Sequence, residues 1–262
     1  MKEVSNCILR AINLNKRFGG LSAVDNVSFG IDALGVTSII GPNGAGKSTL
    51  FNLLSGSFLP DSGSVLIDNQ DVTRLNPEAR LAAGMARSFQ ITNLFFDLSV
   101  IENLQIASQA LESKSRLYLP SFRSEMAIQR AEDLLREFEL VGSRHLLAGS
   151  LSHGEQRRLE IAVTLATKPS LLLLDEPTQG MSQADTQETA DLIMRLGINI
   201  TVLLIEHDVD LVMNLSKKVI VMAQGCKLAE GTPDAVRSNP LVQAAYFGEE
   251  DRKSTRLNSS HT

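Results

Sequence analysis

One short stretch limits what this chain can fold into more than any other. It fits the pattern G-x-x-x-x-G-K-[ST], in which glycines let the backbone curl around a phosphate and point several N–H groups inward. The stretch reads Gly41, Pro42, Asn43, Gly44, Ala45, Gly46, Lys47 and Ser48. A short apolar, β-branched run over 36–40 precedes it, and apolar residues at helical spacing follow it to Leu54, with Gly56 as a stop. The sequence therefore predicts a strand, a phosphate-binding loop and a helix, in that order.

The residue types of this loop suit ATP bound with Mg²⁺. The helix beginning near Lys47 adds the positive end of its dipole, Lys47 brings a positive charge to the β- and γ-phosphates, and the Ser48 hydroxyl can ligate Mg²⁺. We predict ATP binding by residues 41–48 together with Thr49. A glycine-rich turn that only joins strand to helix is the alternative, and the buried strand and helix around the loop argue against it. Kinases, GTPases, motors and transporters share such loops, so the loop alone does not choose a function.

Two carboxylates follow a second buried strand. Residues 171–174 are all leucine, as expected for a strand covered on both faces of a parallel sheet, and Asp175 and Glu176 come next. Ligands of open parallel sheets lie at this edge. Asp175 can hold Mg²⁺ through water, and Glu176 can polarise an attacking water. Alone, the pair could equally be two solvated acids at a strand end, and the phosphate loop makes that interpretation weaker.

The segment before this strand carries a helix-start signal. Ser152 and Glu155 form the pattern of a capping box, which predicts a helix running to about Thr167. A helix that begins with serine and glycine also offers N–H groups to a phosphate, and Gly154 leaves room for its approach. Both interpretations can hold together.

Strand and helix signals alternate along most of the chain, but the region at about 92–150 is rich in helix signals. We expect it to be a helical subdomain inserted into an α/β core. The remaining predictions are a strand at 64–68, a helix over 125–141 ended by Gly142, a helix over 182–196 followed by Gly197, a strand at 201–205, a hairpin over 219–230 and a helix start at Thr232-Pro233.

The bulk properties exclude some classes. The 262 residues carry a net charge of −5, which argues against nucleic acid as a partner, and no apolar run approaches the roughly 20 residues that a membrane-spanning helix needs. Cys7 and Cys226 show no metal-ligand spacing and are expected to be reduced thiols. Residues 251–262 resemble a translated sequencing adapter, so we expect a non-native tail outside the fold.

Taken in order, these motifs resemble those of the ATP-binding-cassette (ABC) family. After the loop come Phe89-Gln90, the signature-like segment 151–156, Asp175-Glu176-Pro177-Thr178 and His207. The resemblance covers about residues 8–248. It implies an α/β fold: a phosphate-loop NTPase core with a mixed, mainly parallel sheet, the inserted α-helical subdomain and a small N-terminal antiparallel β part. The domain would span 1–250.

The resemblance also implies roles. Phe18 would stack on adenine, Gln90 would reach Mg²⁺ or the attacking water, and Glu176 would be the catalytic base. His207 would contact the γ-phosphate, while Ser152 and Gly154 would touch the nucleotide of a partner chain. Ser48, Gln90 and Asp175 would be the metal residues. Three departures from the family stand out. His153 replaces the first signature glycine, and Ser182 stands where many relatives have aspartate. Gly35 and Val36 replace the usual small, acidic residues before the first strand.

Further segments look like those of ATPases from branched-chain amino-acid importers, with urea and amide importers as close alternatives. These are 18–24, 86–90, 180–182, 205–208 and 231–248. The resemblance implies a peripheral subunit on the cytoplasmic face of the inner membrane. Its partners would be permease subunits, a second ATPase subunit (identical or not) and, indirectly, a periplasmic or extracellular solute-binding protein. A soluble ABC ATPase acting on ribosomes or DNA fits less well, because the chain has one cassette and no room for a long coiled coil.

Overall fold

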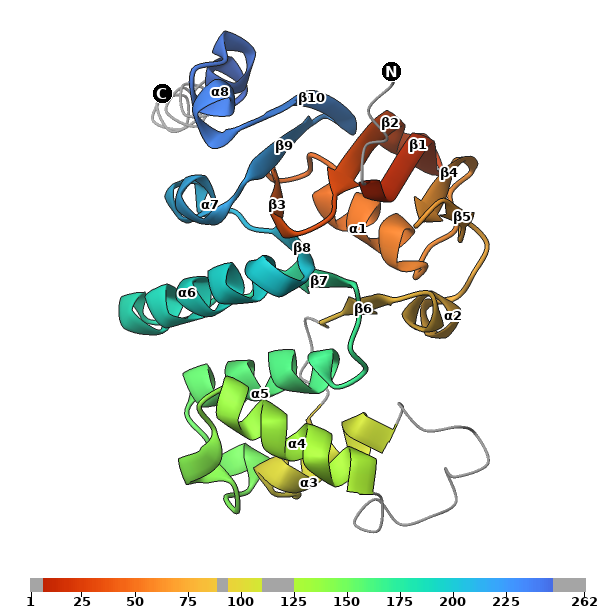
Figure 1. Ribbon diagram of the computed structural model, residues 1–262. Coiled ribbons are helices and arrows are strands. Elements are labelled where there is room, and N and C mark those ends of the chain that lie inside the picture. Colours follow the sequence, from red (N-terminus) through yellow and green to blue (C-terminus); the bar gives the residue numbers. More distant parts are fainter. Residues whose placement is uncertain (1–6, 89–93, 110–124, 247–262) are drawn as a thin grey trace, which may run out of the picture. The chain divides into compact units, whose positions relative to one another are not determined.

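The computed structural model describes residues 7–88, 94–109 and 125–246 (Figure 1). These residues divide into two compact units. The first contains the residues before 84 and after 192, and the second is Gly84–Leu192. Gln90 and the expected adapter-derived tail, 251–262, lie outside the described residues.

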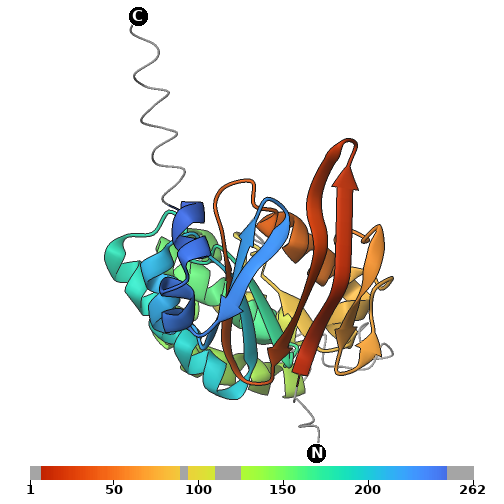
Figure 2. The ribbon, with the colours of Figure 1, turned by 90° about the horizontal axis from the view of Figure 1, so that it is seen from above.

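The first unit contains an antiparallel sheet built mostly from the beginning of the chain. Its strands are β1 (Cys7–Phe18), β2 (Leu21–Asp32), β4 (Ser62–Ile67) and β5 (Gln70–Asp71), in the order β2-β1-β4-β5. Figure 2 shows β1 and β2 as one long hairpin at the red end of the colour scale. The predicted N-terminal antiparallel part is confirmed.

The same unit holds the strands that lead to the phosphate loop. Strand β3 (Gly35–Ile40) pairs in parallel with β8 (Thr201–Ile205) on one side and β9 (Lys218–Ala223) on the other. Strand β10 (Cys226–Gly231) returns antiparallel to β9. Because β3 lies between two neighbours, its last two residues, Ile39 and Ile40, are fully buried. Parallel pairing brings the carboxyl ends of β3 and β8 to one edge, where residues 41 and 206 begin.

Helices pack in the described part of the first unit, and several begin or end where the sequence predicts. They are α1 (Lys47–Ser55), α2 (Pro77–Ala82), α7 (Val209–Leu215) and α8 (Pro233–Arg237). Gly56 ends α1 in the left-handed conformation, with φ of 82°. The side chain of Thr232 accepts from the N–H of Ala235 and caps α8, as Thr232-Pro233 predicts.

The second unit combines a short parallel strand pair with helices. Its elements are β6 (Met85–Arg87), β7 (Leu171–Asp175), α3 (Val100–Ser108), α4 (Glu125–Glu137), α5 (His153–Leu165) and α6 (Gln183–Asn199), which begins here and ends in the first unit. Two 3₁₀ turns, Val141–Ser143 and Ala148–Ser150, precede α5. The described part of 92–150 is thus mainly helical, while the boundaries of the expected subdomain stay a prediction.

Two helix ends differ from prediction. Helix α4 ends at Glu137, because Glu139 turns left-handed with φ of 57° and the N–H of Leu140 bonds back to the carbonyl of Leu135. Gly142 lies instead in the following 3₁₀ turn. Helix α6 runs through Gly197, where a Cβ would come within 3.0 Å of Val36 Cγ2. The glycine there permits close packing of the helix on β3 and does not end the helix.

Among the described residues, no helix combines the length and the apolar character that crossing a bilayer requires.

Candidate functional site

The phosphate loop joins the buried strand β3 to helix α1, as the sequence predicts. Two of its glycines are fixed by close backbone approach. A Cβ at Gly41 would lie 2.2 Å from the carbonyl oxygen of Met222, and one at Gly46 would lie 2.2 Å from that of Ala23. Gly46 also has φ of 95°, a conformation that favours glycine. The loop is therefore clamped between β9 and β2 by contacts that tolerate no side chain.

The start of α1 is left open for an anion. Gly46 is its N-cap residue and makes no side-chain cap, and the first turn contains no acidic residue. The free N–H groups of a helix start carry partial positive charge, so this end attracts phosphate. Ser48 lies exposed in the first turn, and Thr49 is half-buried beside it.

Lys47 lies back over the loop. Its side chain is buried, and Nζ donates to the carbonyl oxygens of Gly41 at 2.6 Å and Pro42 at 3.1 Å. These two contacts hold the ammonium charge at the loop. A charge placed there can be redirected to phosphate oxygens by rotation of the lysine side chain.

Two further predicted residues belong to the same unit. Phe18 ends β1 and is 47% exposed, with its ring edge-to-face against Phe58 at 5.7 Å between centroids. His207 follows β8 and is largely exposed, with Nδ1 3.6 Å from a carboxylate oxygen of the fully buried Glu206. Asp208 then caps α7. The exposed ring of Phe18 is available for stacking, and the exposed imidazole of His207 is free to turn toward a ligand.

The predicted acidic pair lies in the second unit, at the end of β7. Asp175 is 3% exposed, and its Oδ2 accepts a hydrogen bond from Arg87 at 3.0 Å. Burial raises the pKa of Asp175, and the charge of Arg87 opposes that rise. Its other oxygen, Oδ1, is buried and has no hydrogen-bond partner among the described residues. A buried carboxylate with one open oxygen fits a site for Mg²⁺ or its water ligands.

Glu176, the predicted catalytic base, has an unusual backbone. Its φ of 46° places a non-glycine residue in the left-handed region. Residues held in such conformations cluster at functional sites, because the surrounding structure must offset their strain. The side chain of Glu176 is half-buried and, with Asp175, borders a cavity of about 290 Å³ inside this unit. The cavity is lined by His153, Gln156, Arg157, Glu160, Asp175, Glu176, Pro177, Gln179, Gly180 and Met181.

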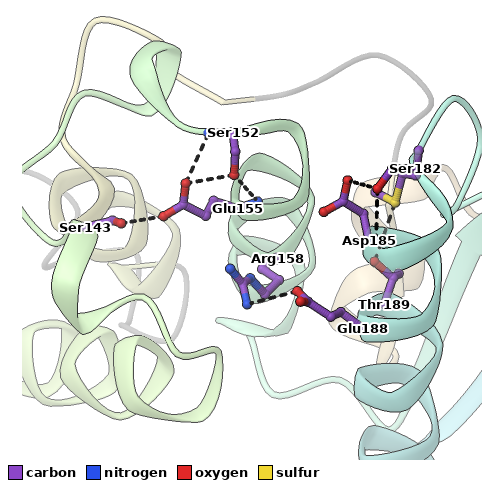
Figure 3. A network of polar contacts seen from close by, with 9 residues as sticks. Ser143, Ser152, Glu155, Arg158, Ser182, Asp185, Glu188 and Thr189 are labelled. Carbon is purple, nitrogen blue, oxygen red and sulfur yellow. Dashed lines mark hydrogen bonds and ion pairs between the residues drawn. The ribbon is translucent and has the colours of Figure 1, made fainter.

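The predicted capping box at α5 is confirmed and extended (Figure 3). Ser152 Oγ lies 2.8 Å from Glu155 Oε2 and accepts from the N–H of Glu155 at 3.3 Å. The second oxygen of Glu155 accepts from Ser143 Oγ at 2.6 Å. Hydrogen bonds from Ser143 and then Ser152 lower the pKa of Glu155.

Asp185 lies next to both Gly154 and Ser182. Figure 3 shows its contact with Ser182. A Cβ at Gly154 would lie 3.0 Å from Asp185 Oδ1, so close contact between α5 and α6 favours glycine. Ser182 precedes α6, donates to Asp185 at 2.7 Å and accepts from its N–H at 3.2 Å. Ser182 therefore caps the start of α6.

The structure gathers the predicted residues into two sets, one in each unit. Phe18, the loop over 41–49 and His207 belong to the first, and Ser152, Gly154, Asp175 and Glu176 belong to the second. Sequence reasoning gave no role to Arg87 or Ser143. Arg87 is 88 positions from Asp175 along the chain, and no local pattern links the two.

A phosphate loop between a parallel strand and a helix, in a chain that also carries an acidic strand end, defines a nucleotide-binding protein of the phosphate-loop class. The chain belongs to the ABC transporter family, whose model matches residues 24–179. A model described as branched-chain amino acid ATP-binding cassette transporter matches residues 226–252. The predicted resemblance and fold class are thereby confirmed.

Individual relatives align along nearly their whole length. The chain is 42% identical to LivG of Escherichia coli K12, a high-affinity branched-chain amino acid transport ATP-binding protein, over 94% of this chain and 100% of LivG. It is 40% identical to BraF of Pseudomonas aeruginosa, similarly described, with the same coverage. A crystal structure of an ATP-binding cassette of an ABC transporter in its ADP conformation is 34% identical, with a TM-score of 0.83 over 92% of this chain and 99% of that one.

Proposed function

We propose that this chain is the ATP-hydrolysing subunit of an ABC importer for branched-chain amino acids. One observation carries the proposal. A clamped phosphate loop with Lys47 and an open helix start occurs in a chain that aligns almost end to end with LivG and BraF.

The site residues divide the chemistry between them. The N–H groups of 41–49 and Lys47 would bind the phosphates, and Phe18 would stack on the adenine. Ser48 and Asp175 would hold Mg²⁺, with Gln90 as a further member, and the ion would neutralise charge on the β- and γ-phosphates. Glu176 would accept the proton of the attacking water, and His207 would contact the γ-phosphate. The open Oδ1 of Asp175 and the strained backbone of Glu176 support these assignments.

A second ATPase subunit would complete the site. In this proposal each ATP is held between the loop of one chain and Ser152 and Gly154 of the other. ATP then favours the closed pair, and hydrolysis removes the phosphate that joins the halves. The Ser152 cap and the tight Gly154 contact support a rigid second half-site.

An apolar strip in the second unit supports docking to a membrane-spanning permease. Phe95, Phe96, Leu146 and Leu147 are each about half exposed. Backbone hydrogen bonds between 96–100 and 146–149 hold the two segments side by side, including Gly149 to Phe96 at 3.1 Å. Clustered exposed apolar side chains mark interaction surfaces. Membrane association of this subunit would follow from that contact.

The proposal is tested by transport. Cells that express this chain with its permease and solute-binding partners should take up labelled leucine, isoleucine or valine. Uptake should stop when Lys47 is replaced by alanine. Uptake of urea or amides in place of these amino acids would overturn the cargo, and uptake that survives Lys47→Ala would overturn the role as motor.

A further inference from the structure

We propose that Arg87 neutralises the buried carboxylate of Asp175 before the metal–nucleotide complex binds. Arg87 then competes with Mg²⁺ for this carboxylate. This inference rests on the proposed function, because it takes Asp175 as the carboxylate that holds Mg²⁺.

Strand register places the two side chains together. Strands β6 and β7 run parallel, with Arg87 opposite Leu173, two residues before Asp175. Both residues end their strands, so their side chains meet at the carboxyl edge. The guanidinium reaches Asp175 Oδ2 at 3.0 Å, and the two side chains are 15% and 2% exposed. Little water can therefore weaken the pair.

The contact satisfies only half of the carboxylate. A guanidinium nitrogen of Arg87 donates to Oδ2, whereas Oδ1 stays buried without a hydrogen-bond partner among residues 7–88, 94–109 and 125–246. Arginine and carboxylate often pair through two parallel hydrogen bonds, which would engage both carboxylate oxygens. Asp175 borders a cavity, and a buried carboxylate with one unpaired oxygen is suited to a second, cationic partner.

A second arginine near the cavity forms its ion pair with another residue. Arg157 also borders the cavity, but its guanidinium pairs with Glu160 at 2.7 Å on the same helix. Within the described part of the chain, Arg87 donates a hydrogen bond directly to Asp175. A guanidinium and a divalent ion that share one carboxylate repel each other. Arg87 therefore weakens metal binding and favours entry of the ion together with the nucleotide, whose phosphates add negative charge.

Metal affinity gives a readout separate from turnover. The probe is Mn²⁺ in the presence of saturating ADP, with free ion measured by electron paramagnetic resonance. Arg87→Gln should bind Mn²⁺ about 3- to 10-fold more tightly than the native chain, because the competing charge is gone. Arg87→Lys keeps a hydrated, shorter cation and should fall between the two. If the glutamine variant does not fold, the lysine variant alone should still show about twofold tighter binding.

A matched variant separates this effect from loss of any arginine. Arg144 forms a hydrogen-bonded ion pair with Glu132 in the same unit. Arg144→Gln should leave the Mn²⁺ affinity at the native value. Unchanged or weaker Mn²⁺ binding in the Arg87 variants, or equal tightening in Arg144→Gln, would overturn the inference. Hydrolysis of ATP by the native chain is measured alongside: its absence would count against the proposed function, whereas native hydrolysis with unshifted Mn²⁺ affinity would count against Arg87 alone.

Discussion

Helices α1 and α5 both begin where the sequence indicates phosphate binding, but their first turns differ. Helix α1 follows Gly46, has no side-chain cap and carries no acid in its first turn. Helix α5 follows Ser152, whose capping box with Glu155 already occupies the helix start with a carboxylate. One end is open to an anion, and the other is closed by its own side chain.

This difference makes the start of α1 the primary phosphate site and the start of α5 a conditional one, which binds phosphate only once ATP is held elsewhere. Free N–H groups and the helix dipole make the start of α1 attractive to an anion at all times. At α5 the side chains of Ser152 and Glu155 accept hydrogen bonds from backbone N–H groups at the helix start. The helix is therefore stable without a ligand, and it attracts phosphate less strongly. Such a half-site suits a surface that acts only after ATP is bound elsewhere.

The largest expected effect is on α1. Lys47→Ala should reduce ATP affinity about 100-fold or more, because a buried charge at the phosphates is lost. Ser152→Ala should leave the affinity of the single chain for ATP near native, because α5 is the conditional site. Fluorescence anisotropy of a labelled ATP analogue measures both. Native ATP affinity in Lys47→Ala, or an equal loss of ATP affinity in Ser152→Ala, would show that the two helix starts do not differ as proposed.

The next effect concerns pairing of chains. Glu176→Gln should bind ATP, stop hydrolysing it and accumulate dimers in sedimentation experiments. Adding Ser152→Ala should weaken these dimers about tenfold, through loss of a hydrogen bond to a charged group. Ser99 and Glu102 form a second capping box, at α3, with the same local pattern. Adding Ser99→Ala should leave dimerisation unchanged; if it weakens the dimer equally, the effect is only one of helix capping.

A smaller effect of opposite sign is expected from Glu155. In the Glu176→Gln background, Glu155→Gln should tighten the ATP-dependent dimer about threefold, because a negative charge beside Ser152 is removed. Glu102→Gln at α3 is the control and should have no effect. Weaker dimers in Glu155→Gln would show that the carboxylate helps to hold the phosphate site.

The smallest effect is on stability and its dependence on pH. The pKa of Glu155 is lowered in the folded chain. Its carboxylate therefore stabilises the fold at pH values above its unfolded pKa of about 4.5, and this stabilisation is lost as the pH falls through its folded pKa. Ser143→Ala removes the first cause of this shift. It should reduce unfolding free energy by about 1 kcal/mol at pH 7 and by less at pH 4. Urea unfolding at the two pH values measures this, and an equal loss at both would refute the linkage.

Local patterns predicted much of this protein because their bonds join residues a few positions apart. The strand–loop–helix at 36–54, the capping box of Ser152 and the cap of Thr232 needed only neighbouring residues. Glycines were less reliable markers. Gly142 and Gly197 each suggested a helix end, but one lies in a 3₁₀ turn and the other is set by packing against Val36.

Arg80 shows what no local pattern contained. It is fully buried and donates to the carbonyls of Leu53 at 2.7 Å and of Leu54, where α1 ends, and to Thr73 at 2.9 Å. Burial lowers its pKa to about 10. A cation at the carboxyl end of α1 complements the helix dipole. The sequence motifs gave Arg80 no role, because its partners lie on another helix and on a separate segment.

The sequence by itself determined the phosphate loop, the acidic strand end and the helix caps, because each depends on the order of a few adjacent residue types. Only the tertiary structure decided the hydrogen-bond partners of the charged side chains. Arg87 donates to Asp175, Ser143 donates to Glu155, and Arg80 donates to carbonyls at the end of α1. The Arg87 contact follows from strand register, and the other two follow from packing that brings distant residues together, so that buried or partly buried polar groups satisfy one another.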